Sequence, residues 1–179
     1  MKQAFASIDR RTLLIGGGVG VGLIVAVLAW PRGGAGDLPL RDGEQAFGPF
    51  IKVGRDGRVT VAVPQVETGQ GIWTALPQIV ADELGAAWET VAVEPAPPGR
   101  AYANGVAEAE GWSEGARRIT AGSSSVRAFE QPLRDAGAMA RALLIAAAAG
   151  RWNVAADECD TADGFVLHAG KTLPFAQLA

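Results

Sequence analysis

The sequence predicts an α+β fold, with a β-hairpin and helices packed on a mixed sheet, preceded by an N-terminal transmembrane or signal helix. Residues 50–63 contain two β-branched runs around a turn, and residues 72–84 and 126–149 carry apolar side chains at helical spacing. Residues 12–30 are uncharged and apolar. We therefore expect a signal or anchor over residues 1–32, a linker over residues 33–48 and one domain over residues 49–179.

The composition limits the classes of function. The 179 residues carry a formal net charge of −3, with one cysteine and one histidine. Such a chain lacks the broad basic surface typical of nucleic-acid binding, so we expect no nucleic-acid partner. Cys159 alone cannot form an internal disulfide, an iron–sulfur cluster or a multi-thiolate zinc site. His168 has no nucleophile near it in the sequence and is expected to be structural or exposed.

The N-terminal segment has the pattern of an export signal. The apolar run Thr12–Trp30 would extend about 27 Å as a helix, close to the thickness of a bilayer core. Arg10 and Arg11, followed by Leu13 and Leu14, resemble a twin-arginine signal; a signal anchor for the general secretory route is the alternative. Both interpretations place the domain at the periplasmic face of the bacterial inner membrane, or in the periplasm if the signal is cleaved.

The first part of the domain reads as strand, strand, helix, strand. Phe50–Val53 and Val59–Val63 flank an Asp-Gly turn, which predicts a hairpin. A helix is expected from about Trp73 or Thr74, with Pro77 in or near its first turn and Gly85 at its end. Thr90–Glu94 then predicts a short strand that Pro95 stops.

The second part is expected to begin with a long surface loop over Gly99–Thr120. A second helix is predicted over Val126–Ala149, closed by Gly150. Strands near Asn153–Cys159 and at Phe165–His168 follow, and another helix begins at Pro174.

Three arginines of the second predicted helix, Arg127, Arg134 and Arg141, are seven residues apart and share one helical face. A solvated helix edge is the simpler interpretation. An electrostatic seam to a partner or a phosphate is the alternative.

Two glycine-containing loops precede the two helices. In Glu67-Thr68-Gly69-Gln70-Gly71, the glycines allow a ligand to approach the backbone closely, and free N–H groups at a helix start favour an anion such as phosphate. In Gly122-Ser123-Ser124-Ser125, the hydroxyls can cap the helix or donate to an oxyanion. Each loop taken alone also has a purely structural explanation.

Taken together, the loops carry a family resemblance that extends from Phe50 to Leu178. The residues that carry it are Val63–Pro77, Val80–Gly85, Thr120–Arg127 and Leu133–Ala138. This stretch resembles the molybdopterin-binding large subunit of the xanthine dehydrogenase and aldehyde oxidase family, in particular the isoquinoline 1-oxidoreductase and nicotinate dehydrogenase type. Thr68 stands where the family usually has methionine, and Ala121 where it usually has glycine.

The resemblance implies an N-terminal portion of a molybdenum hydroxylase large subunit, with residues 49–179 as a partial molybdopterin-binding domain. Such enzymes oxidise or hydroxylate aldehydes or N-heterocycles. It implies that the cofactor contacts Gly69, Gln70, Gly71, Gly122, Ser123, Ser124 and Ser125, and that the two helix starts suit its phosphate. It implies molybdopterin shared with the missing part of the large subunit, and iron–sulfur clusters on a small partner subunit.

The expected partners are therefore the remainder of the large subunit or a second polypeptide, the small iron–sulfur subunit, a cytochrome electron acceptor and the membrane. The active-site glutamate of the family lies near the far end of its longer chain, so we assign no catalytic residue and no metal ligand here and expect no complete enzyme. Glu67 and Glu83 have no local partner in the sequence that would tune them. The alternative function is a membrane-tethered, non-catalytic binding or scaffold module, as a degenerate or split copy.

Overall fold

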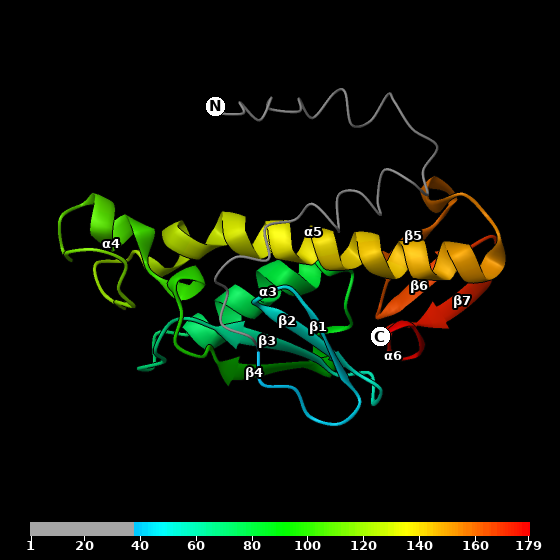
Figure 1. The fold of residues 1–179 in the computed structure, drawn as a ribbon, viewed down its shortest axis with the longest axis horizontal. Helices are drawn as coiled ribbons and strands as arrows, with labels where there is room; N and C mark the ends of the chain where they lie inside the picture. Colours follow the sequence, from blue (N-terminus) through cyan, green and yellow to red (C-terminus); the bar gives the residue numbers. More distant parts are fainter. Residues whose placement is uncertain (1–37) are drawn as a thin grey trace, which may run out of the picture. The chain divides into compact units, whose positions relative to one another are not determined.

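A computed structural model describes residues 38–179. The expected signal or anchor over residues 1–32 lies outside these residues. Within the described part, no helix is long and apolar enough to cross a membrane. The described residues form an α+β arrangement in which two helices lie along one side of a four-stranded sheet (Figure 1).

The sheet is mixed, as the sequence predicts. Its strands run in the order β1 (Glu44–Phe47), β2 (Ile51–Gly54), β3 (Val59–Val63) and β4 (Val91–Pro95). The pairs β1–β2 and β2–β3 are antiparallel, and β3–β4 is parallel. The predicted hairpin is confirmed. The N–H of Gly54 donates to the carbonyl of Arg58 at 2.9 Å, and Gly57 has the positive φ of 85° that the turn requires.

Helix α3 (Ile72–Leu84) lies in the connection between the parallel strands β3 and β4. Parallel neighbours cannot be joined by a tight turn and need such a crossover. The helix begins at Ile72, slightly earlier than predicted, so Pro77 lies early in the second turn, next to the first. The predicted end is confirmed, because Gly85 has φ 72° and its N–H donates to the carbonyl of Ala81.

Helix α5 (Ser125–Trp152) is 28 residues long and packs against α3. The two helices approach closely at Gly137, where a Cβ atom would lie 2.8 Å from Cβ of Glu83. The prediction that Gly150 closes this helix is wrong: the helix continues to Trp152 and ends at Asn153, in the left-handed region at φ 55°. An internal glycine costs a helix only about 1 kcal/mol, which the buried neighbours Ala148 and Ala149 can offset by packing.

Two segments differ from the sequence-based expectation of irregular chain. Strand β1 lies within residues 33–48, for which the sequence predicts a linker. The prediction missed this strand because it begins with a charged and a polar side chain and shows no apolar alternation. The expected loop Gly99–Thr120 contains the short helices η2 (Arg100–Tyr102) and α4 (Gly105–Ala109). Tyr102 and Asn104 are fully buried, so this segment belongs to the folded core.

The C-terminal part forms a separate antiparallel sheet of β5 (Asp160–Ala162), β6 (Phe165–His168) and β7 (Lys171–Pro174), followed by α6 (Phe175–Leu178). Strand β6 and the helix after Pro174 are confirmed.

The strand predicted over Asn153–Cys159 is wrong, because the chain forms the short helix η3 (Ala156–Glu158) before β5 starts. As expected, His168 has a structural position. Its Nδ1 lies 3.0 Å from the carbonyl oxygen of Glu158, and its ring packs near that of Trp152.

Alternation along β2 places Lys52 on the face of the sheet opposite Ile51 and Val53. Its side chain is only 2% exposed. Its Nζ donates to Glu44 at 3.1 Å, to Glu94 at 2.9 Å and to the carbonyl of Pro39 at 3.0 Å. Lys52 therefore joins β1, β2 and β4 through a buried charge.

Candidate functional site

The first predicted loop follows the buried strand β3 and leads directly into α3. Gly69 and Gly71 have φ values of 96° and 79°, which glycine adopts without strain. Apart from the glycine and its two chain neighbours, no residue has a heavy atom within 4 Å of the position that a Cβ would take at either site. The backbone of both glycines therefore faces open space, and a ligand can approach it closely.

Three N–H groups in the loop and the first turn of α3 are occupied by a side chain of this chain, contrary to the sequence-based expectation of free N–H groups. The Oε1 atom of Glu67 accepts from Gly69 at 2.7 Å and from Gly71 at 3.0 Å, and Oε2 accepts from Trp73 at 3.0 Å. The expectation that Glu67 has no local partner is therefore wrong. An acidic residue just before a helix start is the signal that could have revealed this contact.

These hydrogen bonds, first from Trp73 and then from Gly71, hold the pKa of Glu67 below its ordinary value of 4.5. The ionised form is thus favoured by the folded loop. Its stabilising contribution is fully present above the ordinary pKa and is lost as the pH falls through the lowered one.

The side chain of Gln70 folds back into its own loop. Its Oε1 accepts from the N–H and the hydroxyl of Thr68 at 2.6 and 2.7 Å, and its Nε2 donates to the carbonyl of Val66 at 2.7 Å. Thr68, which departs from the family pattern, therefore takes part in holding Gln70.

The second predicted loop also has an ordered backbone, with φ values of 59° at Gly122 and 53° at Ser123. Ser124 is buried; its hydroxyl donates to the carbonyl of Ala121 at 2.6 Å and accepts from Asn104 at 2.7 Å. Ser124 is the N-cap residue of α5, and its side chain makes no capping hydrogen bond. Ser124 is thus a structural residue of the loop, while Ser123 is exposed.

The structure brings the two loops together at the end of β3. The hydroxyl of Ser125 donates to Oε1 of the buried Gln65 at 2.8 Å, across 60 residues of sequence. The N–H of Val66 donates to the hydroxyl of Thr120 at 3.0 Å, across 54 residues. Sequence reasoning did not identify Gln65 or Thr120 as the residues that join the loops, because pairing over such separations leaves no local pattern.

Trp112 packs on the second loop. A Cβ at Gly122 would lie 1.9 Å from Cη2 of this indole, so only glycine allows the contact. Trp112 as a whole residue is 45% exposed. Trp112 thus covers one side of Gly122 and forms part of the border of the paired loops.

We expect Gly122→Ala to destabilise the fold by about 1–2 kcal/mol through its left-handed backbone, with an added cost for moving Trp112. Gly57→Ala is the matched control, because Gly57 also has a positive φ and no atom lies near its Cβ position. The free energies of unfolding of both variants would be measured in urea, together with indole fluorescence. An equal loss of stability in the two variants, with unchanged fluorescence, would contradict a restrictive contact with Trp112.

The three spaced arginines of α5 pair within the chain. Arg127 contacts Glu110 at 2.5 Å, and Arg141 pairs with Asp160. Arg134 lies 3.5 Å from Asp82 and 3.4 Å from Glu83, so Glu83 also has a partner that the sequence did not reveal. These ion pairs connect α5 to other elements, and the arginine face is not an unpaired seam for a phosphate.

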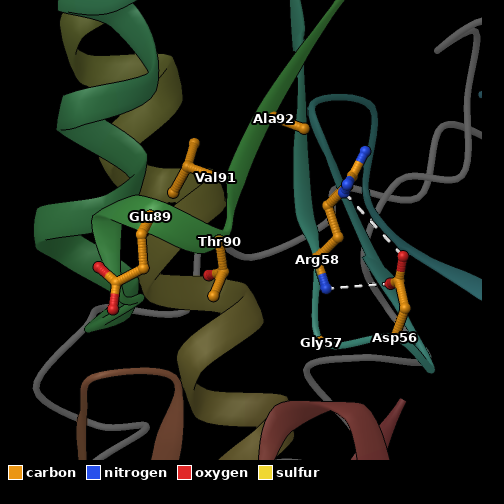
Figure 2. Close-up of a pocket in the computed structure, with 7 residues that line it drawn as sticks. All are labelled: Asp56, Gly57, Arg58, Glu89, Thr90, Val91 and Ala92. Carbon is orange, nitrogen blue, oxygen red and sulfur yellow. Dashed lines mark hydrogen bonds and ion pairs between the residues drawn. The ribbon is translucent and has the colours of Figure 1, made fainter.

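A cavity lies at the end of the sheet opposite the paired loops (Figure 2). It measures about 510 Å³ and is lined by Asp56, Gly57, Arg58, Glu89, Thr90, Val91 and Ala92. These residues surround the starts of β3 and β4, whereas the paired loops follow the end of β3. Within residues 38–179, no three His, Cys, Asp or Glu side chains cluster in a way that could hold a metal ion.

Comparisons with known proteins identify the kind of domain. The sequence pattern of a family described as molybdopterin cofactor-binding domain matches residues 11–179. The chain is 42% identical to the beta subunit of isoquinoline 1-oxidoreductase from Brevundimonas diminuta, over 66% of its length and 14% of that protein. It is 32% identical to a membrane-bound aldehyde dehydrogenase, named as pyrroloquinoline-quinone dependent, of Gluconacetobacter polyoxogenes, over 97% of its length and 21% of that protein.

A third relative is a nicotinate dehydrogenase subunit of Pseudomonas putida, with 33% identity over 75% of this chain and 10% of that protein. The chain therefore spans between a tenth and about a fifth of the length of these relatives. A solved structure of quinoline 2-oxidoreductase from Pseudomonas putida aligns with 72% of this chain and 15% of that chain, at a TM-score of 0.47 and 23% identity.

Proposed function

The chain belongs to the family of molybdopterin cofactor-binding domains, and from this premise we propose that its two paired loops contact the molybdopterin cofactor of a molybdenum hydroxylase. The observation that carries the proposal is the pair of hydrogen bonds that join Gln65 and Val66, directly before the Glu67–Gly71 loop, to Ser125 and Thr120 at the second loop. These bonds hold the bases of the two segments that the resemblance implicates next to each other. The chain would act as the N-terminal portion of a large subunit that oxidises or hydroxylates aldehydes or N-heterocycles.

The residues present fit such a ligand in two respects. The backbone at Gly69 and Gly71 is open to close approach. The second loop offers the exposed hydroxyl of Ser123 beside the start of α5, which has no side-chain cap. When bound, the cofactor would supply the molybdenum that oxidises the substrate. The described residues would hold and orient it.

We extend the proposal to partners and location. The remainder of the large subunit, on this or a second polypeptide, would complete the site. A small iron–sulfur subunit and a cytochrome would accept the electrons. Two of the relatives are named as subunits of larger enzymes, which supports such an assembly. The arginine pair and apolar run of residues 10–30 support export to the periplasmic side and a membrane tether.

The test is purification of the tagged full chain from its host, followed by measurement of molybdenum, of the pterin and of co-purifying polypeptides. Gly71→Asn places a side chain in the open space, and we expect it to lower the molybdenum content about tenfold, equivalent to about 1.4 kcal/mol of binding. Gly170→Asn is the matched control, because its φ of 80° and its empty surroundings are close to those of Gly71.

Molybdenum retained equally by both variants would contradict the assignment of the loop. A wild-type chain with neither molybdenum nor a larger polypeptide would overturn the enzyme proposal. That result would favour the non-catalytic binding or scaffold module.

A further inference from the structure

The start of α3 binds a carboxylate that belongs to this chain. Three N–H groups, from Gly69, Gly71 and Trp73, point at the two oxygens of Glu67 with donor–acceptor distances between 2.7 and 3.0 Å. Glu67 lies six residues before Trp73, so its side chain crosses the whole loop. This side chain therefore links the loop to the first turn of the helix.

This contact changes which ligands the loop can accept. The N–H groups at a helix start ordinarily attract phosphate and other anions, because they are unpaired and carry partial positive charge. Here the carboxylate already takes that position. A phosphate at the same place would have to displace Glu67 or lie against its negative charge.

The other polar side chains of the loop also form hydrogen bonds within the loop. The side chain of Gln70 bonds to Thr68 and Val66, and not outward. What the loop leaves open is the backbone of Gly69 and Gly71, beside which no atom lies within 4 Å of a Cβ position. The glycine backbone itself carries no charge, and the Glu67 carboxylate beside it disfavours an anion, so this open surface suits an uncharged part of a ligand.

We propose that Glu67 is a positioning residue of the cofactor loop, which fixes the conformation of Gly69–Gly71 and excludes phosphate from the start of α3. The loop then receives an uncharged part of its ligand, and any phosphate lies elsewhere, as at the second loop. The statement about the ligand rests on the proposed function. The exclusion of phosphate does not, because it concerns this chain alone.

The experiment uses the full chain, labelled with ¹⁵N in detergent, and inorganic phosphate and acetate as probes. In the wild-type chain we expect phosphate to leave the amide signals of Gly69, Gly71 and Trp73 unshifted. In Glu67→Ala the same amides should exchange with solvent about tenfold faster. They should now shift on addition of phosphate, and acetate should restore their protection by replacing the missing carboxylate.

Glu114→Ala is the matched control, because Glu114 is an exposed carboxylate in a loop. Its removal should change neither exchange at the three amides nor their response to phosphate. Glu67→Gln keeps a side chain of the same size without the charge, and should give an intermediate loss of protection.

A phosphate-dependent shift of the three amides in the wild-type chain would overturn the proposal, and this arm needs no variant to fold. Unchanged exchange in Glu67→Ala, or an equal change in Glu114→Ala, would overturn it as well. Failure of the proposed function is seen separately, as an absence of molybdenum from the purified wild-type protein. An absence of molybdenum would not alter the expected exchange rates or phosphate response of the three amides, because these depend on Glu67 and not on the cofactor.

Discussion

Lys52→Ala is expected to destabilise the domain by about 3–5 kcal/mol, because removal of one partner from a buried ion pair leaves the other charges uncompensated. Glu44 and Glu94 have side chains that are only 14% and 21% exposed, and both point at the Nζ of Lys52. The second oxygen of Glu94 is buried and has no hydrogen-bond partner among the described residues. Without the ammonium group, two poorly solvated carboxylates would remain on the same face of the sheet.

The measurement is urea unfolding of the full chain at neutral pH. Arg58→Ala is the control, since Arg58 pairs with Asp56 at 4.0 Å on the surface and its side chain is 62% exposed. Such exposed pairs contribute about 0–1 kcal/mol. The triple variant with Lys52→Met, Glu44→Gln and Glu94→Gln should recover much of the lost stability. If Lys52→Ala costs no more than Arg58→Ala, the buried charge does not hold the strands together.

The pKa of Glu44 gives this prediction a pH dependence. It is lowered first by the N–H of Arg41 and, against the effect of burial, also by Lys52. A lowered carboxyl pKa stabilises the fold above the unfolded pKa, and this contribution is lost as the pH falls through the folded value. The stability difference between wild type and Lys52→Ala should therefore shrink on acidification.

Tyr102→Ala is expected to cost about 3–5 kcal/mol, the range for truncating a large buried aromatic side chain. Tyr102 is fully buried, and its ring meets that of Phe50 edge to face with centroids 5.5 Å apart. Its hydroxyl donates to the carbonyl of Pro49 at 2.7 Å. The side chain thus ties the Gly99–Thr120 segment to the chain that enters β2.

Tyr102→Phe separates packing from hydrogen bonding, and should cost about 1 kcal/mol for the lost donor. Both variants would be unfolded in urea while indole fluorescence is recorded. Because Asn104 links the same segment to Ser124 of the second loop, Tyr102→Ala should also loosen that loop. A loss in Tyr102→Phe as large as in Tyr102→Ala would show that the ring packing contributes little.

The elements that were predictable from sequence are those with a strong local pattern. The hairpin around Asp56-Gly57 follows from turn chemistry, and α3 follows from its apolar spacing and Gly85. Strand β1 escaped prediction because an edge strand with Glu44 and Gln45 has no apolar alternation. The end of α5 was misplaced because tertiary packing outweighs the propensity of Gly150.

For the candidate site, the sequence indicated the two loops but not how they are held. The glycines and serines mark the loops locally. The contacts of Gln65 with Ser125 and of Val66 with Thr120 are set by the fold, so no window of sequence contains them. The carboxylate of Glu67 was within reach of local reasoning, since it lies in the same loop as its N–H donors.

The separation between Gln65 and Ser125 also sets an order of events during synthesis. At the usual rate of about 5–20 residues per second, the 60 residues between them take about 3–12 s to emerge from the ribosome. Until then, the first loop has nothing to pair with. The paired loops therefore cannot guide the early folding of the chain, and a cofactor that needs both loops can bind only after Ser125 has been synthesised.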